Sequence, residues 1–237
     1  MRNKSWVLPI IVISQFCCTS LWFAGNGVMQ DLVLDFGLNS QALGHLTSTV
    51  QFGFIIGTFI FALLTIADRF SPSLVFFISA ILGALFNLGT ILNGNDLLSL
   101  LVFRFLTGFF LAGIYPVGMK IAADYFEKGL GRSLGFLVGA LVVGTAFPHL
   151  LKGFTGAMPW RLVLILTSSI AAIGGLLMIF LVPDGPYRKR SQILDLRALF
   201  KVFRNKSFRS AAFGYFGHMW ELYAFWAFVP FMLSYYV

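Results

Sequence analysis

The chain is poor in charged residues and in cysteine. Only 11% of its 237 residues are Asp, Glu, Lys or Arg, whereas about a quarter of a soluble domain is charged. The two cysteines, Cys17 and Cys18, are adjacent, which argues against a disulfide-stabilised secreted domain. The sequence also lacks a phosphate-binding loop, zinc-ligand spacing and a nucleophile elbow. It therefore predicts no cofactor, no metal and no enzymatic activity.

The sequence does contain seven apolar runs, each long enough to cross a membrane. A bilayer core requires about 20 apolar residues in a helix, and only helices and closed barrels pair all their backbone groups there. The alternating pattern of a membrane barrel is absent. The runs are residues 6–29, 42–67, 73–92, 97–122, 133–151, 162–182 and 211–237. These runs predict an all-α, polytopic membrane protein.

The net charge is +8, and the positions of the basic residues along the chain indicate the membrane topology. With a cytoplasmic N-terminus, every Lys and Arg except Arg104, Lys152 and Arg161 falls on or near the inner side, as the positive-inside rule expects. This bias predicts an integral protein of the cytoplasmic (plasma) membrane. Anionic lipid headgroups are then the expected anionic partner, and no nucleic acid is expected.

The loops divide the chain into three parts. Short loops join the first six runs, which predicts a bundle of antiparallel neighbours over residues 1–183. Residues 184–210 form a long basic connector in which apolar and charged residues alternate, as in an amphipathic helix on the inner leaflet; a disordered basic linker is the alternative. Residues 211–237 are the seventh run.

A motif follows the second run. Residues 64–72 read Leu-Thr-Ile-Ala-Asp-Arg-Phe-Ser-Pro, and this resembles the G-x-L-A-D-R-x-G-R-R signature of the major facilitator superfamily, although both glycines and the basic pair are replaced. The resemblance implies a six-helix bundle followed by the first helix of a second one. It also implies that Asp68 and Arg69 belong to a conformational gate. A solvated helix end is the alternative interpretation.

Arg104 lies within the fourth run, in the segment Leu-Val-Phe-Arg-Phe-Leu-Thr-Gly over residues 101–108. The segment resembles the helix-four motif of the same superfamily, in which an Arg precedes a Gly by four positions. Arg104 is about 10 Å from the outer end of its helix, at 1.5 Å per residue. A charge at that depth is costly and marks a functional site, unless the side chain extends to the outer headgroups.

The remaining candidates are polar residues inside the runs. Glu221 is the only acid inside any run, and His218 lies three residues earlier on the same helical face. Both groups can exchange a proton near neutral pH, although a structural hydrogen bond is the alternative. Further residues expected in a substrate cavity, or else in hydrogen bonds between helices, are Tyr215, Gln15, Asn26 and Gln51.

The resemblance implies a secondary active transporter that moves a small solute by alternating access, with protons as coupling ions. A seven-span receptor is an alternative, but the last run has no lysine for a retinal Schiff base and the N-terminus is predicted inside. A helical subunit of a membrane complex is another. The resemblance further implies that the partner is a missing C-terminal half, encoded after Val237 or lost from a truncated or split transporter.

Overall fold

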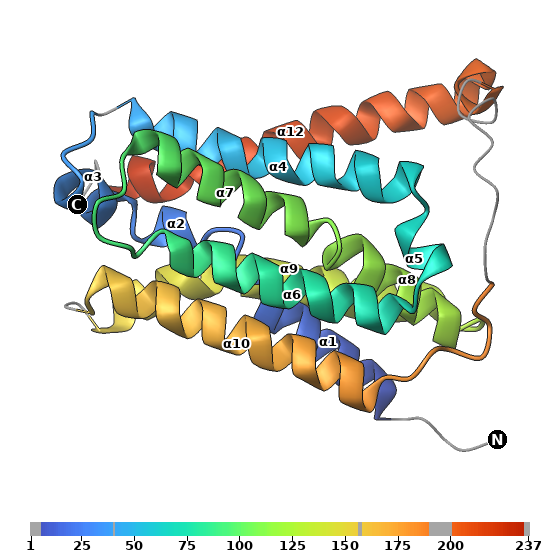
Figure 1. The fold of residues 1–237 in the computed structure, drawn as a ribbon. Coiled ribbons are helices and arrows are strands. Elements are labelled where there is room, and N and C mark those ends of the chain that lie inside the picture. Colours follow the sequence, from blue (N-terminus) through green and yellow to red (C-terminus); the bar gives the residue numbers. More distant parts are fainter. Residues whose placement is uncertain (1–5, 40, 156–157, 190–200, 235–237) are drawn as a thin grey trace. The chain divides into compact units, whose positions relative to one another are not determined.

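The computed structural model describes residues 6–39, 41–155, 158–189 and 201–234 (Figure 1). Within these residues all regular structure is helical, which confirms the all-α prediction. The helices are α1 (Val7–Thr19), α2 (Ala24–Gly27), α3 (Met29–Asp35), α4 (Ala42–Leu63), α5 (Ile66–Arg69), α6 (Pro72–Gly89), α7 (Leu97–Leu111), α8 (Tyr115–Tyr125), α9 (Leu130–Thr155), α10 (Trp160–Leu181) and α12 (Lys206–Ser234).

The chain divides into two compact units, residues 1–192 and 193–237. The first unit holds α1 to α10, and the second holds α12. The first unit includes the segment that follows α10, which bonds to the turn at Phe70 and Ser71. The domain bounds 1–183, 184–210 and 211–237 remain a prediction. Most of the predicted amphipathic helix lies outside the described residues, although residues 201–204 are helical.

Five helical segments of the described chain are long and apolar enough to span a membrane. They are Ala42–Leu63, Pro72–Gly89, Leu97–Tyr125, Leu130–Gly153 and Trp160–Leu181. Helix α1 is apolar but shorter. Helix α12, with 29 residues, is long enough but is not among the five, because His218, Glu221 and its glycines lower its hydropathy. That α12 crosses the membrane remains a prediction.

Two of the predicted spans are broken helices. The run at residues 6–29 was expected to be one continuous span, but α1 ends at Thr19 and a turn over residues 20–23 precedes α2. The fourth span breaks at residues 112–114, between α7 and α8, where Pro116 lies in the first turn of α8. The breaks therefore lie in the first and the fourth span, which would occupy corresponding positions if spans one to three and spans four to six were two repeats.

Small residues allow the helices of the first unit to approach closely. Helix α4 packs along α7, α6 packs along α10, and α1 packs against α9 and α10. A side chain added at Gly53 of α4 would collide with the carbonyl oxygen of Phe105, and one at Gly108 of α7 would collide with that of Val50. In a membrane such close backbone contact supplies much of the association energy between helices. The α4–α7 pair therefore sets the position of Arg104.

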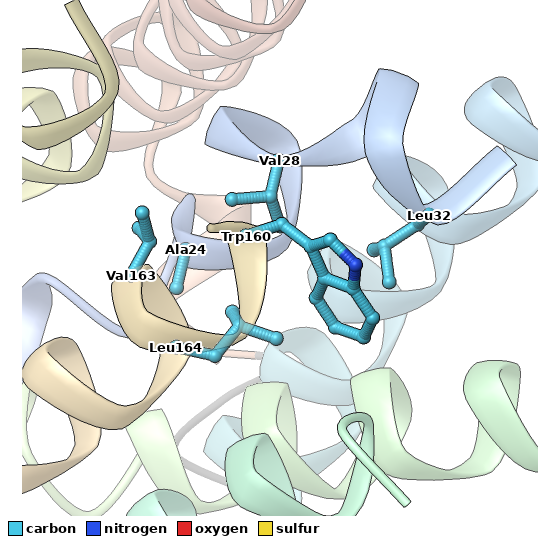
Figure 2. Packing of buried hydrophobic residues seen from close by; sticks show 6 residues of the cluster. All are labelled: Ala24, Val28, Leu32, Trp160, Val163 and Leu164. Carbon is cyan, nitrogen blue, oxygen red and sulfur yellow. The ribbon is translucent and has the colours of Figure 1, made fainter. Parts of the chain in front are cut away.

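An apolar cluster closes the end of the first unit that carries α2 and α3. Figure 2 shows Trp160 at the start of α10 among Val28, Leu32 and Leu164. The indole Nε1 donates to Asp35 Oδ2 at 2.9 Å. Burial of the ring with a satisfied N–H ties the second part of the broken first span to α10.

Candidate functional site

Arg104 lies on the buried face of α7 and binds the break in the first span. Arg104 is only 2% exposed. Its Nη2 donates to the backbone oxygen of Trp22 at 2.8 Å and to Asn26 Oδ1 at 3.3 Å. The alternative in which Arg104 extends to the outer headgroups is therefore wrong for this structure. The guanidinium is held inside the bundle by acceptors on the α1–α2 segment.

Trp22 links Arg104 to α4. Its indole Nε1 donates to Gln51 Oε1 at 3.1 Å, and its ring centroid lies 4.5 Å from that of Phe54. One turn further along, Asn26 Nδ2 donates to Thr47 Oγ1 at 2.8 Å. Three predicted site residues, Arg104, Asn26 and Gln51, thus meet around Trp22, and this group is called the Trp22 cluster below.

The Trp22 cluster has more hydrogen-bond donors than acceptors. Arg104 Nε, Arg104 Nη1 and Gln51 Nε2 are buried and have no partner within the described residues. No carboxylate of that part of the chain lies within ion-pair distance of Arg104. A buried charge without a counter-ion is costly and is retained in membrane spans where it has a function.

Gly25 makes room for the guanidinium. A methyl group at this position would lie 3.1 Å from both Cζ and Nε of Arg104, which is tighter than ordinary carbon contacts. Any larger side chain at residue 25 would therefore press on Arg104 and displace it from the oxygen of Trp22. The sequence analysis did not single out Gly25, although a glycine in the middle of an apolar run is a signal for close approach.

Gln15 belongs to a different part of the bundle. It is fully buried on α1, and its Oε1 lies against Gly118 of α8, where an added side chain would collide with it. Neither polar atom of its side chain has a partner among the described residues, and the same holds for Ser14 Oγ. The structure thus separates Gln15 from the Trp22 cluster, with which the sequence grouped it.

The predicted proton-exchanging residues lie on the second unit. Tyr215, His218 and Glu221 are at three-residue intervals along α12, so their Cβ atoms lie along one side of that helix. Their role in a cavity remains a prediction.

The predicted gating residues lie at the opposite end of the first unit from α3. Asp68 Oδ1 is 2.9 Å from Lys120 Nζ, which is also 3.6 Å from Asp124 Oδ1. Arg69 Nε donates to Thr65 Oγ1 at 3.1 Å. These residues flank an open cavity of about 190 Å³, lined in part by Thr65, Asp68 and Lys120. Asp68 therefore forms an ion pair with Lys120. The alternative interpretation had treated it as a side chain that only water contacts at a helix end.

The segment after α10 is bonded to the same end of the first unit. Arg188 pairs with Asp184 and donates through Nη2 to the backbone oxygen of Phe70 at 2.6 Å. Ser71 Oγ donates to Asp184 Oδ1 at 2.7 Å. The segment therefore joins the turn that contains Asp68 to the end of the sixth span. Sequence analysis missed this contact because the residues involved are more than 100 positions apart. We call Asp68, Lys120, Asp124, Asp184 and Arg188 the charged cluster.

The long apolar helices are those of an integral, helical membrane protein. The chain belongs to the Major Facilitator Superfamily, whose family model matches residues 11–237. It is similar to the efflux pump FUBT of Fusarium oxysporum, with 27% identity over 200 residues that cover 81% of this chain and 33% of the relative.

Other relatives come from Acinetobacter baylyi. The chain is 28% identical to the 4-hydroxybenzoate transporter PcaK over 78% of this chain and 40% of the relative. It is 29% identical to the niacin transporter NiaP over 58% of this chain and 36% of the relative. The chain thus spans well under half the length of these relatives.

The fold is also that of a solved transporter. A bacterial homologue of the human lysosomal transporter Spinster, in its inward-facing and unoccupied conformation, superposes with a TM-score of 0.69 and 17% identity. The match covers 86% of this chain and 49% of that structure.

Proposed function

We propose that the chain is part of a secondary active transporter that moves a small solute by alternating access and is coupled to protons. The observation that carries this proposal is the Trp22 cluster, in which Arg104 of the fourth span holds the break in the first span. Breaks at corresponding positions of inverted repeats typically mark the substrate site near the membrane midplane. The family and the named relatives support the transporter class.

Proton coupling is proposed for Glu221 and His218. Glu221 is the only acid inside any predicted span, and His218 lies on the same side of α12. An acid at membrane depth is retained for function, and Asp, Glu and His side chains form the proton relays of pumps and transporters. Protonation of this pair would then accompany the change between inward-open and outward-open states.

Small organic acids are the first solutes to test. The chain is similar to a 4-hydroxybenzoate transporter and a niacin transporter, and each of these named compounds carries one carboxylate on an aromatic ring. The placement of basic residues supports the plasma membrane as the location, with the N-terminus in the cytoplasm.

The charged cluster is proposed to act as the gate at the inner end. The Asp68–Lys120 ion pair joins the turn after the second span to the fourth span. Hydrogen bonds from Ser71 to Asp184 and from Arg188 to the backbone oxygen of Phe70 join that turn to the exit of the sixth span. These elements would then move as one body when the protein changes state, since breaking the pairs would leave partly buried charges unpaired.

Uptake into proteoliposomes tests the function. The complete gene product that carries this chain should accumulate a radiolabelled organic acid when a pH gradient is imposed and should lose accumulation when the gradient is collapsed. Glu221→Gln should abolish gradient-driven accumulation, whereas Glu127→Gln, at an exposed position outside the spans, should leave it intact. Gradient-driven uptake by Glu221→Gln at the wild-type level would overturn the coupling role.

A further inference from the structure

The unpaired donors of the Trp22 cluster specify the chemistry of a ligand. Among the residues that the structure describes, two of the three guanidinium nitrogens of Arg104 have no partner, and neither does the amide nitrogen of Gln51. The two side-chain amide oxygens of the cluster each already accept a hydrogen bond, Gln51 Oε1 from Trp22 and Asn26 Oδ1 from Arg104. A group that only accepts hydrogen bonds would complete the cluster.

The positive charge of Arg104 indicates that the ligand is an anion. Arg104 is buried among the helices and has no carboxylate partner within the described residues. A neutral carbonyl would satisfy the N–H groups but would leave the positive charge uncompensated at membrane depth. A carboxylate supplies two acceptor oxygens and one negative charge, and it forms the strongest hydrogen bonds with a guanidinium.

Two features hold Arg104 ready for such a ligand. The Nη2 bonds to Trp22 and Asn26 fix one side of the guanidinium, and Gly25 leaves the space that the planar group occupies. The side chain is therefore ordered before a ligand arrives, which lowers the entropy cost of binding.

We propose that Arg104, assisted by Gln51, binds the carboxylate of a monoanionic organic acid that the protein transports. This assignment rests on the proposed transport function. Arg104 carries one positive charge that has no carboxylate partner in the described part of the chain, so a monocarboxylate is bound in preference to its neutral amide. Gln51 donates through Nε2 while its Oε1 keeps the indole of Trp22 in place.

Binding to the purified complete protein tests the proposal with benzoate and benzamide as probes, which differ in charge but hardly in shape. The wild-type protein should bind benzoate at least about 10-fold more tightly than benzamide, since a hydrogen-bonded charge contributes roughly that much or more. Arg104→Gln should weaken benzoate binding by about 10- to 100-fold and leave benzamide binding unchanged. Gln51→Leu should weaken benzoate binding by a smaller factor.

Arg161→Gln provides the matched control, because Arg161 lies at the outer end and pairs with Asp35 at 3.4 Å. It should leave both affinities unchanged. If Arg104→Gln does not fold, Arg104→Lys is measured instead. Lysine keeps the charge but lacks the planar fork, so a several-fold loss of benzoate affinity supports the proposal and an unchanged affinity overturns it. A wild-type protein that binds benzoate no better than benzamide also overturns it.

Uptake measurements separate this proposal from the transport function. A protein that accumulates a neutral solute along a gradient, without preferring benzoate over benzamide, would retain the transport function and lose the carboxylate site. A protein that binds benzoate through Arg104 but never accumulates any solute would retain the carboxylate site and lose the transport function.

Discussion

The Trp22 cluster and the charged cluster differ in how their charged groups are paired. In the charged cluster Lys120 lies between two aspartates and Arg188 pairs with Asp184, so positive and negative groups compensate one another. In the Trp22 cluster Arg104 has only neutral partners among the described residues. Paired charges hold helices together, whereas an unpaired buried charge is available to a ligand. On this contrast rests our proposal of a mechanical role for the charged cluster and a binding role for the Trp22 cluster.

The largest effect is expected from removing the helix contact that positions Arg104. Gly108→Val would force a side chain into the backbone of α4 at Val50 and should lower the free energy of unfolding by roughly 1–3 kcal/mol or more. The Trp22 cluster would be disturbed, because α4 contributes Gln51 to it and α7 contributes Arg104. Thermal unfolding in detergent measures the change.

Gly139→Val on α9 serves as the control, because no atom lies within 4 Å of an added Cβ at that position. Its unfolding temperature should stay near the wild-type value. Equal destabilisation by the two substitutions would contradict close α4–α7 packing as the cause.

An effect of intermediate size is expected when one basic residue is removed from each cluster and the stabilities of the two variants are compared. Lys120→Met leaves Asp68 and Asp124 without their shared partner and should lower stability by roughly 1–3 kcal/mol. Arg104→Met removes hydrogen bonds but also removes a buried unpaired charge, so stability should change by less than about 1 kcal/mol. The same unfolding assay applied to both variants gives the result. If Arg104→Met were the more destabilised variant, Arg104 would be primarily a structural residue.

The smallest effect concerns the start of α7, the helix that carries Arg104. Asp96 accepts a hydrogen bond from the backbone N–H of Ser99 at 2.8 Å and forms a capping box with it. Hydrogen bonds from Ser99 lower the pKa of Asp96 below its usual value of 3.8. A carboxyl whose pKa is lowered in the folded state stabilises that state above its unfolded pKa and loses the contribution as the pH falls through the folded pKa.

Stability should therefore decline slightly below about pH 4 through Asp96, and Asp96→Asn should remove that part of the decline. Comparing the unfolding temperatures of the wild type and Asp96→Asn across the acidic range measures it. Identical pH profiles would show that the cap contributes nothing.

The sequence predicted the five long apolar segments of the first unit because membrane crossing depends on length and hydropathy, both of which can be read directly from the residues. It missed the break at residues 20–23 because the segment Ser-Leu-Trp-Phe is itself largely apolar and contains neither Gly nor Pro. The break in the fourth span had the usual signals in Gly113 and Pro116. At the break in the first span the backbone oxygen of Trp22 accepts a hydrogen bond from Arg104, a tertiary contact that no residue pattern reveals.

For the candidate site, sequence analysis identified polar residue types but not their grouping. Arg104 was conspicuous as a charge in an apolar run, whereas its partner is a backbone oxygen that no residue pattern reveals. Gln15 and Asn26 share one predicted span, but the structure places Gln15 against Gly118 and Asn26 beside Thr47. Lys120 was counted only as an inner positive charge, because its ion pair depends on the approach of α5 to α8.

The most direct measurement is an experimental structure of the complete protein with benzoate bound. The account predicts a carboxylate oxygen within about 3 Å of Nε or Nη1 of Arg104, with Nη2 still bonded to the backbone oxygen of Trp22. Arg104 paired with a carboxylate of the protein itself, and benzoate bound elsewhere, would contradict the account.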